Sequence, residues 1–314
     1  MKMGKALKRL LLALLAAILV FVIAAGALML HLGSKLNVQP ATGNDNKVSP
    51  SGISNILLIG VDNDYAPGME QLGNADGIIL ATINEKTNTI VLTSFMRDIK
   101  VNVPGHGTMK LTRSYHTGGA PLLIETLESN FDINIDSYVL VNYINVVDIV
   151  DAAGGIQMEV NRDELYYMQP KIENINSLLG QPAGSNIIPL EQAGSLTLNG
   201  VQTAAFMRVR MAGNNDLERT ERARRVLMAL KDKVLSGSIQ EMYSFAETAM
   251  SCITTDMEHT QLLTLAMNAA KYLKYDMNSA RIPIDNSFYY SQDGNAFVVI
   301  DFEENIHALH EYIN

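Results

Sequence analysis

The stretch Asn55-Ile-Leu-Leu-Ile-Gly-Val-Asp62 decides the fold class of this chain of 314 residues. Its segment Ile56–Val61 is almost wholly apolar, which is typical of a β-strand covered on both faces. Three more segments rich in apolar and β-branched residues follow, separated by turn-rich spacers, at Gly77–Ile83, Thr89–Ser94 and Lys100–Val103. The sequence therefore predicts a sheet that lies between layers of helices.

Helical and extended patterns alternate in the rest of the chain. Apolar residues recur with helical spacing in Pro121–Asn130 and Ile144–Ala153, and Gly154-Gly155 ends the second helix before a strand at Ile156–Val160. We expect, in order, a long surface excursion at Tyr166–Gln192, a short strand at Ala204–Arg210, a helix at Asp216–Leu235 capped by Asn215, further segments at Ser244–Met257 and Thr260–Leu273, and a β-containing tail at Ile282–Ile300. This order predicts an α/β fold, a three-layer α/β/α sandwich built as one domain from residues 54–314.

The N-terminus has the pattern of a membrane anchor. Residues 1–9 carry four basic side chains and no acid, and the uncharged run of 21 residues from Leu10 to Leu30 would form about 31 Å of helix, enough to cross a bilayer. We expect a cytoplasmic basic tail at 1–9, a single transmembrane helix at 10–31, a linker at 32–53, and a domain on the outer side of the cell membrane. A cleaved signal peptide is the alternative, since Ala24–Ala27 are small, although the run exceeds the usual 7–15 residues.

Charge and cysteine content exclude several kinds of partner and site. Residues 36–314 carry 19 basic and 33 acidic side chains, a net charge of −14, so we expect no binding to nucleic acid. Cys252 is the only cysteine, which excludes internal disulfides and metal sites built from cysteines.

The arginines are clustered, with six of the eleven within 18 residues: Arg208, Arg210, Arg219, Arg222, Arg224 and Arg225. Arg208 and Arg210 are two residues apart on a predicted strand, so their side chains share a face. Arg219 and Arg222 are three apart on a predicted helix and also share a face. Several guanidinium groups beside the free N–H groups of a helix start suit a phosphate or pyrophosphate. For Arg224 and Arg225 we favour the other interpretation, a solvated helix face with Glu218–Arg222 and Glu221–Arg225 pairs.

Acidic residues stand at the ends of the predicted strands. Asp62 ends the first strand, Asp76 opens the next, and Arg97-Asp98 follows the third. Ligands of α/β sheets usually bind at adjacent strand ends, and two carboxylates beside a phosphate suit Mg²⁺. Lys110 and Arg113, three residues apart, would approach the same anion. An aspartate in such a position is otherwise a common turn residue.

The order of these segments resembles the LytR-CpsA-Psr family. The resemblance rests on the opening stretch and on Ala75-Asp76-Gly-Ile-Ile-Leu80, Ser94-Phe-Met-Arg97-Asp98, Lys110-Leu-Thr with Gly118-Gly119, Val150-Asp-Ala-Ala-Gly-Gly155, Phe206-Met-Arg208-Val-Arg210 and Asp216-Leu-Glu-Arg219-Thr-Glu-Arg222. These motifs span residues 54–235, and the N-terminal anchor matches the family's usual architecture.

The resemblance implies a function and a set of site residues. Family members take teichoic acids or capsular polysaccharides from polyprenyl-pyrophosphate carriers and join them to peptidoglycan through a phosphodiester. By resemblance Mg²⁺ would be the cofactor, held by Asp62 and Asp76. Arg97, Asp98 and Asp216 would be catalytic, the aspartates orienting arginines or acting as the base. The pyrophosphate would be bound by Arg97, Arg208, Arg210 and Arg219, with Lys110, Arg113 and Arg222 as further candidates.

The chain departs from the family pattern in two places. Asn74 stands where the family commonly has arginine, and Thr112-Arg113 where it commonly has asparagine. The lipid would also need an apolar tunnel, for which the helices near 122–150 are one candidate. Two other functions stay open: a non-catalytic, membrane-tethered wall-binding or regulatory protein, and a hydrolase that uses water as the acceptor.

Overall fold

The computed structural model describes residues 34, 37–39, 49–62, 72–209, 215–272, 274–292, 294 and 296–314, with the backbone alone for 215–220, 239, 259, 263, 266, 269 and 270. The predicted cytoplasmic tail, the predicted transmembrane helix and most of the predicted linker lie outside these residues. Within the described ranges, none of the helices has both the length and the apolar character that crossing a bilayer requires.

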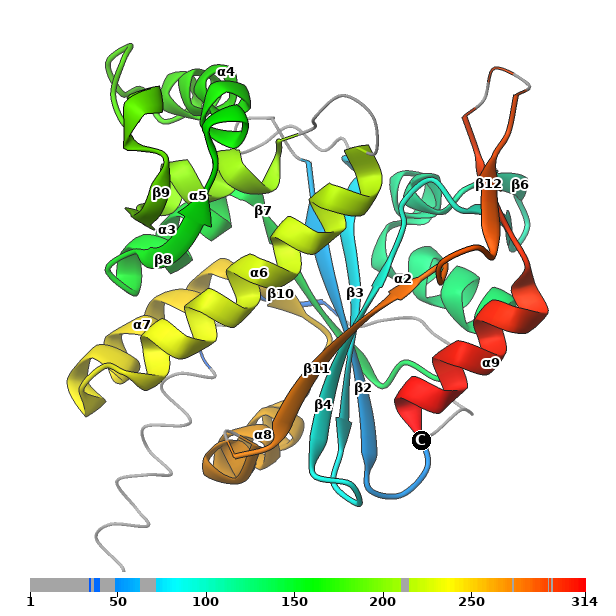
Figure 1. Cartoon of the computed structure of the whole chain (residues 1–314). Helices are drawn as coiled ribbons and strands as arrows, with labels where there is room; N and C mark the ends of the chain where they lie inside the picture. The colour runs from blue at the N-terminus through cyan, green and yellow to red at the C-terminus, as the bar shows by residue number, and fades with distance from the viewer. Residues whose placement is uncertain are drawn as a thin grey trace, which may run out of the picture.

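A seven-stranded mixed sheet forms the centre of the domain (Figure 1). From one edge to the other its strands are β1 (Asn37–Val38), β10 (Thr254–Thr255), β7 (Ser137–Asn142), β2 (Ile53–Val61), β3 (Ala75–Asn84), β4 (Thr89–Phe95) and β11 (Asp276–Ile282). Strands β2, β3 and β4 form an antiparallel meander, while β7 and β11 pair in parallel with β2 and β4. The predicted strands at 56–61, 77–83 and 89–94 are thus confirmed.

Helices cover both faces of this sheet, as expected. Leu57 and Ile59 of β2 are buried in the main core with α2 (Leu111–Phe131) and α9 (Phe302–Ile313). Leu58, between them, belongs to a smaller cluster with α6 (Asn215–Leu235) on the opposite face. The alternation along one strand is the period of two that a strand imposes on its side chains.

A second core lies beside the sheet and is built mainly from five segments that follow β7. It is formed by α3 (Tyr143–Ala152), β8 (Ile156–Val160), α4 (Arg162–Leu178), β9 (Gly194–Leu198) and α5 (Gly200–Met207). The short η1 helix (Leu190–Gln192) precedes β9. Asn142, Asn161 and Asn199 begin the three helices, each in a capping box.

Two predictions in this region are wrong. The expected surface excursion at Tyr166–Gln192 contains most of α4, whose Leu165, Met168, Ile172 and Ile175 are buried in the second core. The expected strand at Ala204–Arg210 is the end of α5. The Asn199 capping box and two alanines favour a helix there, whereas the apolar run alone does not distinguish a helix from a strand.

Two small hairpins and the C-terminal helices complete the described chain. Strands β5 (Lys100–Val103) and β6 (Gly107–Lys110) form one hairpin, and β12 (Phe288–Tyr290) and β13 (Val298–Ile300) form the other. The segments expected after residue 240 correspond to α7 (Ile239–Cys252) and α8 (His259–Tyr272). The predicted β-containing tail at Ile282–Ile300 begins at the end of β11 and contains the second hairpin, and α9 follows it.

Candidate active site

Several strands end together at one edge of the sheet, the edge formed by strand ends rather than by an outermost strand. The predicted acidic residues lie there. Val61, the last residue of β2, is paired with Asn142 at the end of β7 and with Ala75 at the start of β3. Near the end of β4, Ser94 pairs with Ile79 of the same β3. The expectation that these strand ends converge is confirmed.

Asp76 is the extra residue of a β-bulge at this edge. Gly60 pairs with Gly77 and Val61 with Ala75, so between these two pairs β3 has one residue more than β2. A bulge turns a side chain out of the regular alternation and is common beside active sites. The side chain of Asp76 is 6% exposed and lines a small cavity with Tyr143 of α3 and Ala223 of α6.

Arg97, Asp98 and Lys110 form an ion-pair network around Asp76. The Nη1 atom of Arg97 lies 2.6 Å from Oδ1 of Asp76, and its Nε lies 3.5 Å from Oδ2 of Asp98. The Nζ atom of Lys110 lies 3.1 Å from Oδ1 of Asp98. All four side chains are partly or largely buried, so water screens their charges less than at an open surface. The structure therefore brings together four residues that the sequence had proposed.

Thr112 holds the two sides of this network together. Its backbone N–H donates to the carbonyl oxygen of Arg97 at 2.8 Å, and its hydroxyl donates to the carbonyl oxygen of Ala75 at 2.8 Å. Thr112 is buried, so both bonds are shielded from water. Thr112, one of the two positions where the chain departs from the family pattern, thus supports the backbone beside both Arg97 and Asp76.

Asp62 lies on the neighbouring strand end and binds the segment before β3. Its Oδ1 atom accepts a hydrogen bond from the backbone N–H of Asn74 at 2.6 Å, and its own N–H donates to the carbonyl oxygen of Asn74 at 3.1 Å. Asp76 is two residues further along, at the bulge beside the same strand end. The all-oxygen donors of these two carboxylates fit Mg²⁺, which takes one or two carboxylates together with phosphate oxygens and water. Among the described residues no group of three His, Cys, Asp or Glu side chains forms a metal site.

Arg208 reaches the same edge of the sheet through Tyr143. Its guanidinium lies 4.9 Å from the centre of the Tyr143 ring, and its Nη1 donates to Oδ1 of Asn174 at 2.8 Å. Because Arg208 ends a helix rather than a strand, our reason for pairing it with Arg210 is wrong. Tyr143 was missed by the sequence analysis, which did not predict β7; the Asn142–Asn145 capping box was the available signal.

Arg222 and Arg225 are bound to Glu164 of α4. Arg222 is 3% exposed, and its Nε donates to Oε1 of Glu164 at 3.2 Å while its Nη1 donates to the carbonyl oxygen of Val209 at 3.1 Å. Arg225 lies 3.5 Å from the same carboxylate oxygen. A cation buried among such partners already has its charge balanced within the fold. The predicted pyrophosphate role of Arg222 stays a prediction, and this geometry favours a structural role.

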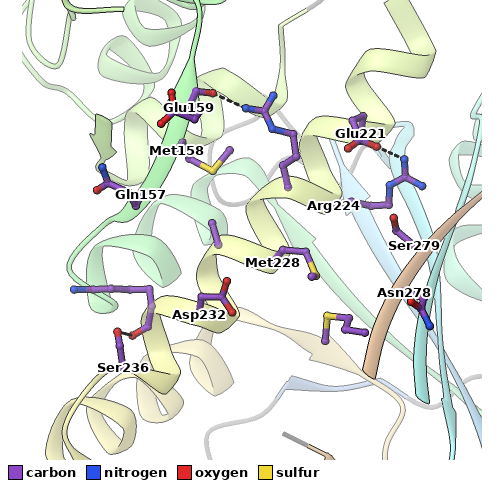
Figure 2. A pocket seen from close by; sticks show the side chains of 14 residues that line it. Gln157, Met158, Glu159, Glu221, Arg224, Met228, Asp232, Ser236, Asn278 and Ser279 are labelled. Carbon is purple, nitrogen blue, oxygen red and sulfur yellow. Dashed lines mark hydrogen bonds and ion pairs between the residues drawn. The ribbon is translucent and has the colours of Figure 1, made fainter. Parts of the chain in front are cut away.

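Arg224 of α6 lines a cavity of about 590 Å³ between α6, β8 and β11 (Figure 2). It forms an ion pair with Glu221 and donates to the carbonyl oxygen of Ala280 on β11. The expectation of a solvated helix face is wrong for these two arginines, because the Arg224 side chain is 11% exposed and Arg225 is paired with Glu164 rather than with the expected Glu221.

Three predicted site residues are not described in full. Arg210 lies outside the described residues. Asp216 and Arg219 lie in the first turns of α6, where the backbone alone is described. Arg113 is exposed on the first turn of α2, three residues after Lys110, and is not part of the ion-pair network described above. Leu123 and Leu127 of α2 are fully buried in the main core, so that helix face is packing rather than tunnel.

Comparison with known proteins agrees with this fold. The LytR_cpsA_psr family model matches residues 31–307, and the chain therefore belongs to the LytR-CpsA-Psr family. The chain is 30% identical over 224 residues to the polyisoprenyl-teichoic acid–peptidoglycan teichoic acid transferase TagU of Oceanobacillus iheyensis, covering 69% of this chain and 62% of the relative. It is 32% identical over 216 residues to the protein of that name from Enterococcus faecalis, covering 68% of this chain and 64% of the relative.

These two matches span less than two thirds of each relative's length. Another relative matches over a longer part of both chains. TagU of Bacillus licheniformis is 26% identical over 314 residues, covering 94% of this chain and 95% of the relative. Among solved structures, "TagT bound to LI-WTA" matches with a TM-score of 0.66 and 22% identity over 88% of this chain and 97% of the other. Bacillus subtilis TagT matches with a TM-score of 0.64 and 22% identity over 88% and 99%. At this identity the structural matches establish the shared fold.

Proposed function

We propose that this protein is a membrane-anchored phosphotransferase that moves a glycopolymer from a polyprenyl-pyrophosphate carrier onto peptidoglycan. The observation that carries the proposal is the Arg97–Asp76 pair at the bulge of β3, joined to Asp98 and Lys110 at the sheet edge. Family membership and the names of the relatives support the same reaction and favour a polymer of the teichoic acid type.

Arg97, Lys110 and Arg208 are the cations for the pyrophosphate. Phosphoryl transfer asks a protein mainly for positioning and for neutralisation of charge on the phosphate oxygens. Asp76 and Asp98 hold Arg97 in one orientation before the substrate arrives, so less reorganisation is needed at the moment of reaction. Asp62 and Asp76 would hold Mg²⁺, which supplies further positive charge to the phosphate oxygens when bound.

The bond changes follow from this arrangement. A hydroxyl of the acceptor glycan attacks the phosphorus that carries the polymer, and the bond from that phosphorus to the bridging oxygen of the carrier breaks. The carrier leaves as polyprenyl phosphate, and the hydroxyl proton passes to a base. Asp98 already contacts both Lys110 and Arg97, which suits it to orienting these cations, so Asp216 becomes the stronger candidate for the base.

The lipid chain requires an apolar surface next to this site. On the sheet face towards α6, several apolar side chains are only partly buried: Leu58, Ala81, Ile90, Met207, Leu227, Met228 and Met277. Met228 and Met277 also line the cavity beside α6 (Figure 2). The small cavity at Asp76 is also lined by Ile78 and Ile79, which follow Asp76 on β3. The same strand therefore leads from the Asp76 cavity to this apolar face. We place the polyprenyl chain between the sheet and α6.

Reconstitution with the full-length protein in detergent tests this function. With Mg²⁺, a polyprenyl-pyrophosphate saccharide and a soluble peptidoglycan oligomer, we expect release of polyprenyl phosphate and a saccharide phosphate linked to the oligomer. Equal release with no oligomer present would indicate a hydrolase. Binding of the oligomer without any release would indicate a wall-binding protein.

A further inference from the structure

A groove runs along one face of α6, between β8 and β11. It is the cavity of about 590 Å³ described above, and its α6 residues run from Glu221 to Ser236. These residues recur three and four positions apart, so they share one face of the helix, and at 1.5 Å per residue this face is about 22 Å long. Figure 2 shows β8 on one side of the helix and β11 on the other. The α6 groove therefore suits an extended chain better than a compact molecule.

The β11 wall of the α6 groove is an outer edge of the central sheet. β11 is the last strand in the sheet order, and within the described part of the chain it pairs with β4 alone. Met277, Asn278 and Ser279 line the groove in succession, although neighbouring side chains leave a strand on opposite faces. The groove therefore meets the edge of this strand, where the backbone is unpaired.

The pairing of β11 shows which backbone groups point outward at this edge. The carbonyl oxygen of Ile282 accepts from the N–H of Met96, so the backbone groups of Ile282 point towards β4. The N–H and C=O of one strand residue point to the same side, and this side alternates along the strand. Ser279, three residues before Ile282, therefore points its N–H and C=O away from β4. The side chains of Asn278 and Ser279 have no hydrogen-bond partner among the described residues, so they too can bind a ligand.

The charges that line the α6 groove balance one another. Arg224 is paired with Glu221, and Arg225 is paired with Glu164 behind the groove. A lining with no excess of either sign gives little attraction to a polyanion, and so many charged groups disfavour an apolar lipid chain. An uncharged chain that is rich in hydrogen-bonding groups fits this lining best. The charged lining residues are Glu159, Glu221, Asp232, Arg224, Arg225 and Lys233.

The glycan strand of peptidoglycan is a chain of this kind. Its sugars carry acetamido groups, each with one N–H and one C=O. The outward N–H and C=O of Ser279 are complementary to such a group, as an unpaired strand edge is to an added peptide strand. Sugar hydroxyl groups would bond the side chains of Asn278 and Ser279, while Met228 and Met277 offer apolar surface to the C–H groups.

The α6 groove begins one helical turn from the candidate active site. Ala223 lines the Asp76 cavity, while Glu221 and Arg224, on the same turn of α6, line the groove. Asp216, the candidate base, precedes Glu221 by five residues, which is about 7.5 Å along the helix. A chain in the groove would therefore have one end beside the proposed reaction.

We propose that the α6 groove binds the glycan strand of the acceptor, with acetamido groups of its sugars on the edge of β11. This inference rests on the proposed function, and it adds the surface on which the acceptor is recognised. Met228 and Met277 belong both to the groove and to the apolar cluster on the sheet, so they separate the glycan from the lipid chain.

Ser279→Pro tests the strand edge directly. The substitution removes an N–H that points away from the sheet, and proline is accepted at such a position of an edge strand. Titration calorimetry of the full-length protein in detergent, with an N-acetylglucosamine tetrasaccharide as the probe, should show roughly tenfold weaker binding than the wild type. In the transfer assay the KM for the peptidoglycan oligomer should rise by a similar factor.

A second variant tests the groove without a change to the backbone. Asn278→Ala combined with Ser279→Ala removes an amide and a hydroxyl and should also weaken binding roughly tenfold. Gln240→Ala combined with Ser244→Ala is the matched control, because it removes the same two groups from exposed positions of α7 outside the groove. The control should bind the tetrasaccharide as the wild type does.

Four outcomes would decide against part of this assignment. Wild-type affinity in both groove variants, or no binding of the tetrasaccharide by the wild type, would overturn the acceptor groove. Displacement of the tetrasaccharide by a glycerol phosphate oligomer would assign the groove to the donor polymer, and displacement by a free stem peptide would assign it to a peptide, so either would also overturn it. Tetrasaccharide binding that the variants weaken, without any transfer by the wild type, would instead refute the proposed function and leave the groove standing.

Discussion

Arg97 donates a hydrogen bond from Nη1 to Oδ1 of Asp76 at 2.6 Å, and Asp76 is the residue that the β-bulge inserts into β3. The bulge and the ion pair depend on each other, since the unpaired strand position turns the carboxylate away from the regular alternation of the sheet. The carboxylate in turn fixes the orientation of a guanidinium that the proposed reaction uses.

Arg97→Ala should lower the turnover of the lipid-linked saccharide by roughly 10²–10³-fold, because a preorganised cation at the transferred phosphate is lost. Arg97→Lys should recover only part of it, since an ammonium lacks the planar fork of donors. The measurement is the initial rate of polyprenyl phosphate release. Arg162→Ala, an exposed arginine at the start of α4, is the control and should behave as wild type. Equal rates in Arg97→Ala and the control would refute the proposed site.

Thr112→Val should weaken both stability and turnover. The substitution keeps the shape but removes the hydroxyl that donates to Ala75, leaving a buried carbonyl oxygen without that bond, at a cost of about 1–3 kcal/mol. We expect a lower midpoint in urea unfolding and a lower kcat, since Ala75 precedes Asp76. Thr117→Val is the matched control on the same helix, because its hydroxyl donates to the carbonyl oxygen of Arg113 at an exposed position.

Arg222→Met should destabilise the fold by about 3 kcal/mol, because Glu164 then keeps a buried charge without its nearest partner. Adding Glu164→Gln should restore part of the loss, since the neutral side chain still serves the capping box of α4. Thermal unfolding of the two variants measures the effect. A rise in the KM for the lipid donor with unchanged stability would instead support a pyrophosphate role for Arg222.

Chelation by EDTA should abolish turnover, and added Mg²⁺ should restore it. Asp62→Asn should raise the Mg²⁺ concentration needed for half-maximal rate, because an amide oxygen is a weaker ligand than a carboxylate. Full activity in EDTA would exclude the magnesium assignment while leaving the arginine site untouched. Asp285→Asn, a surface carboxylate, should leave the Mg²⁺ dependence unchanged.

Burial raises the pKa of Asp256, although the N–H of Tyr138 donates to its carboxylate and acts in the opposite direction. A carboxyl group whose pKa is higher in the folded state binds its proton more tightly there than in the unfolded chain. Its contribution to stability is therefore greatest at low pH and is lost as pH rises through the raised pKa. The difference in unfolding free energy between Asp256→Asn and wild type should thus grow in favour of the variant from pH 4 to pH 7. A constant difference over that range would contradict the assignment.

Local patterns predicted the centre of the sheet and much of the site. The strands at 56–61, 77–83 and 89–94 were recognisable because buried strands are continuous apolar runs. Placing Asp76 and Arg97 at their ends followed from chain order alone. The bulge was not predictable, because it exists only in the pairing of β2 with β3 and leaves no mark in the residues of one strand.

Elements stabilised by distant contacts were missed for a related reason. β7 is a short segment between helices, and its strand character comes from pairing with β2 and β10. The apolar residues of Ala204–Arg210 look alike in a strand and in a helix of two turns, and the capping box that separates these readings lies before the run. Glu164, the partner of Arg222, is 58 residues away in sequence, so no local rule could connect them.

The pairing of β11 with β4 links the backbone support of the candidate active site to a late step of folding. The N–H of Met96, the residue before Arg97, donates to the carbonyl oxygen of Ile282 at 2.9 Å, and residues 89–95 pair with residues 276–282. Such a non-local contact can form only after nearly the whole chain is available, and contacts of this kind form late and slowly. The backbone beside Arg97 therefore gains its last support only when β11, close to nine tenths of the way along the chain, has docked on β4.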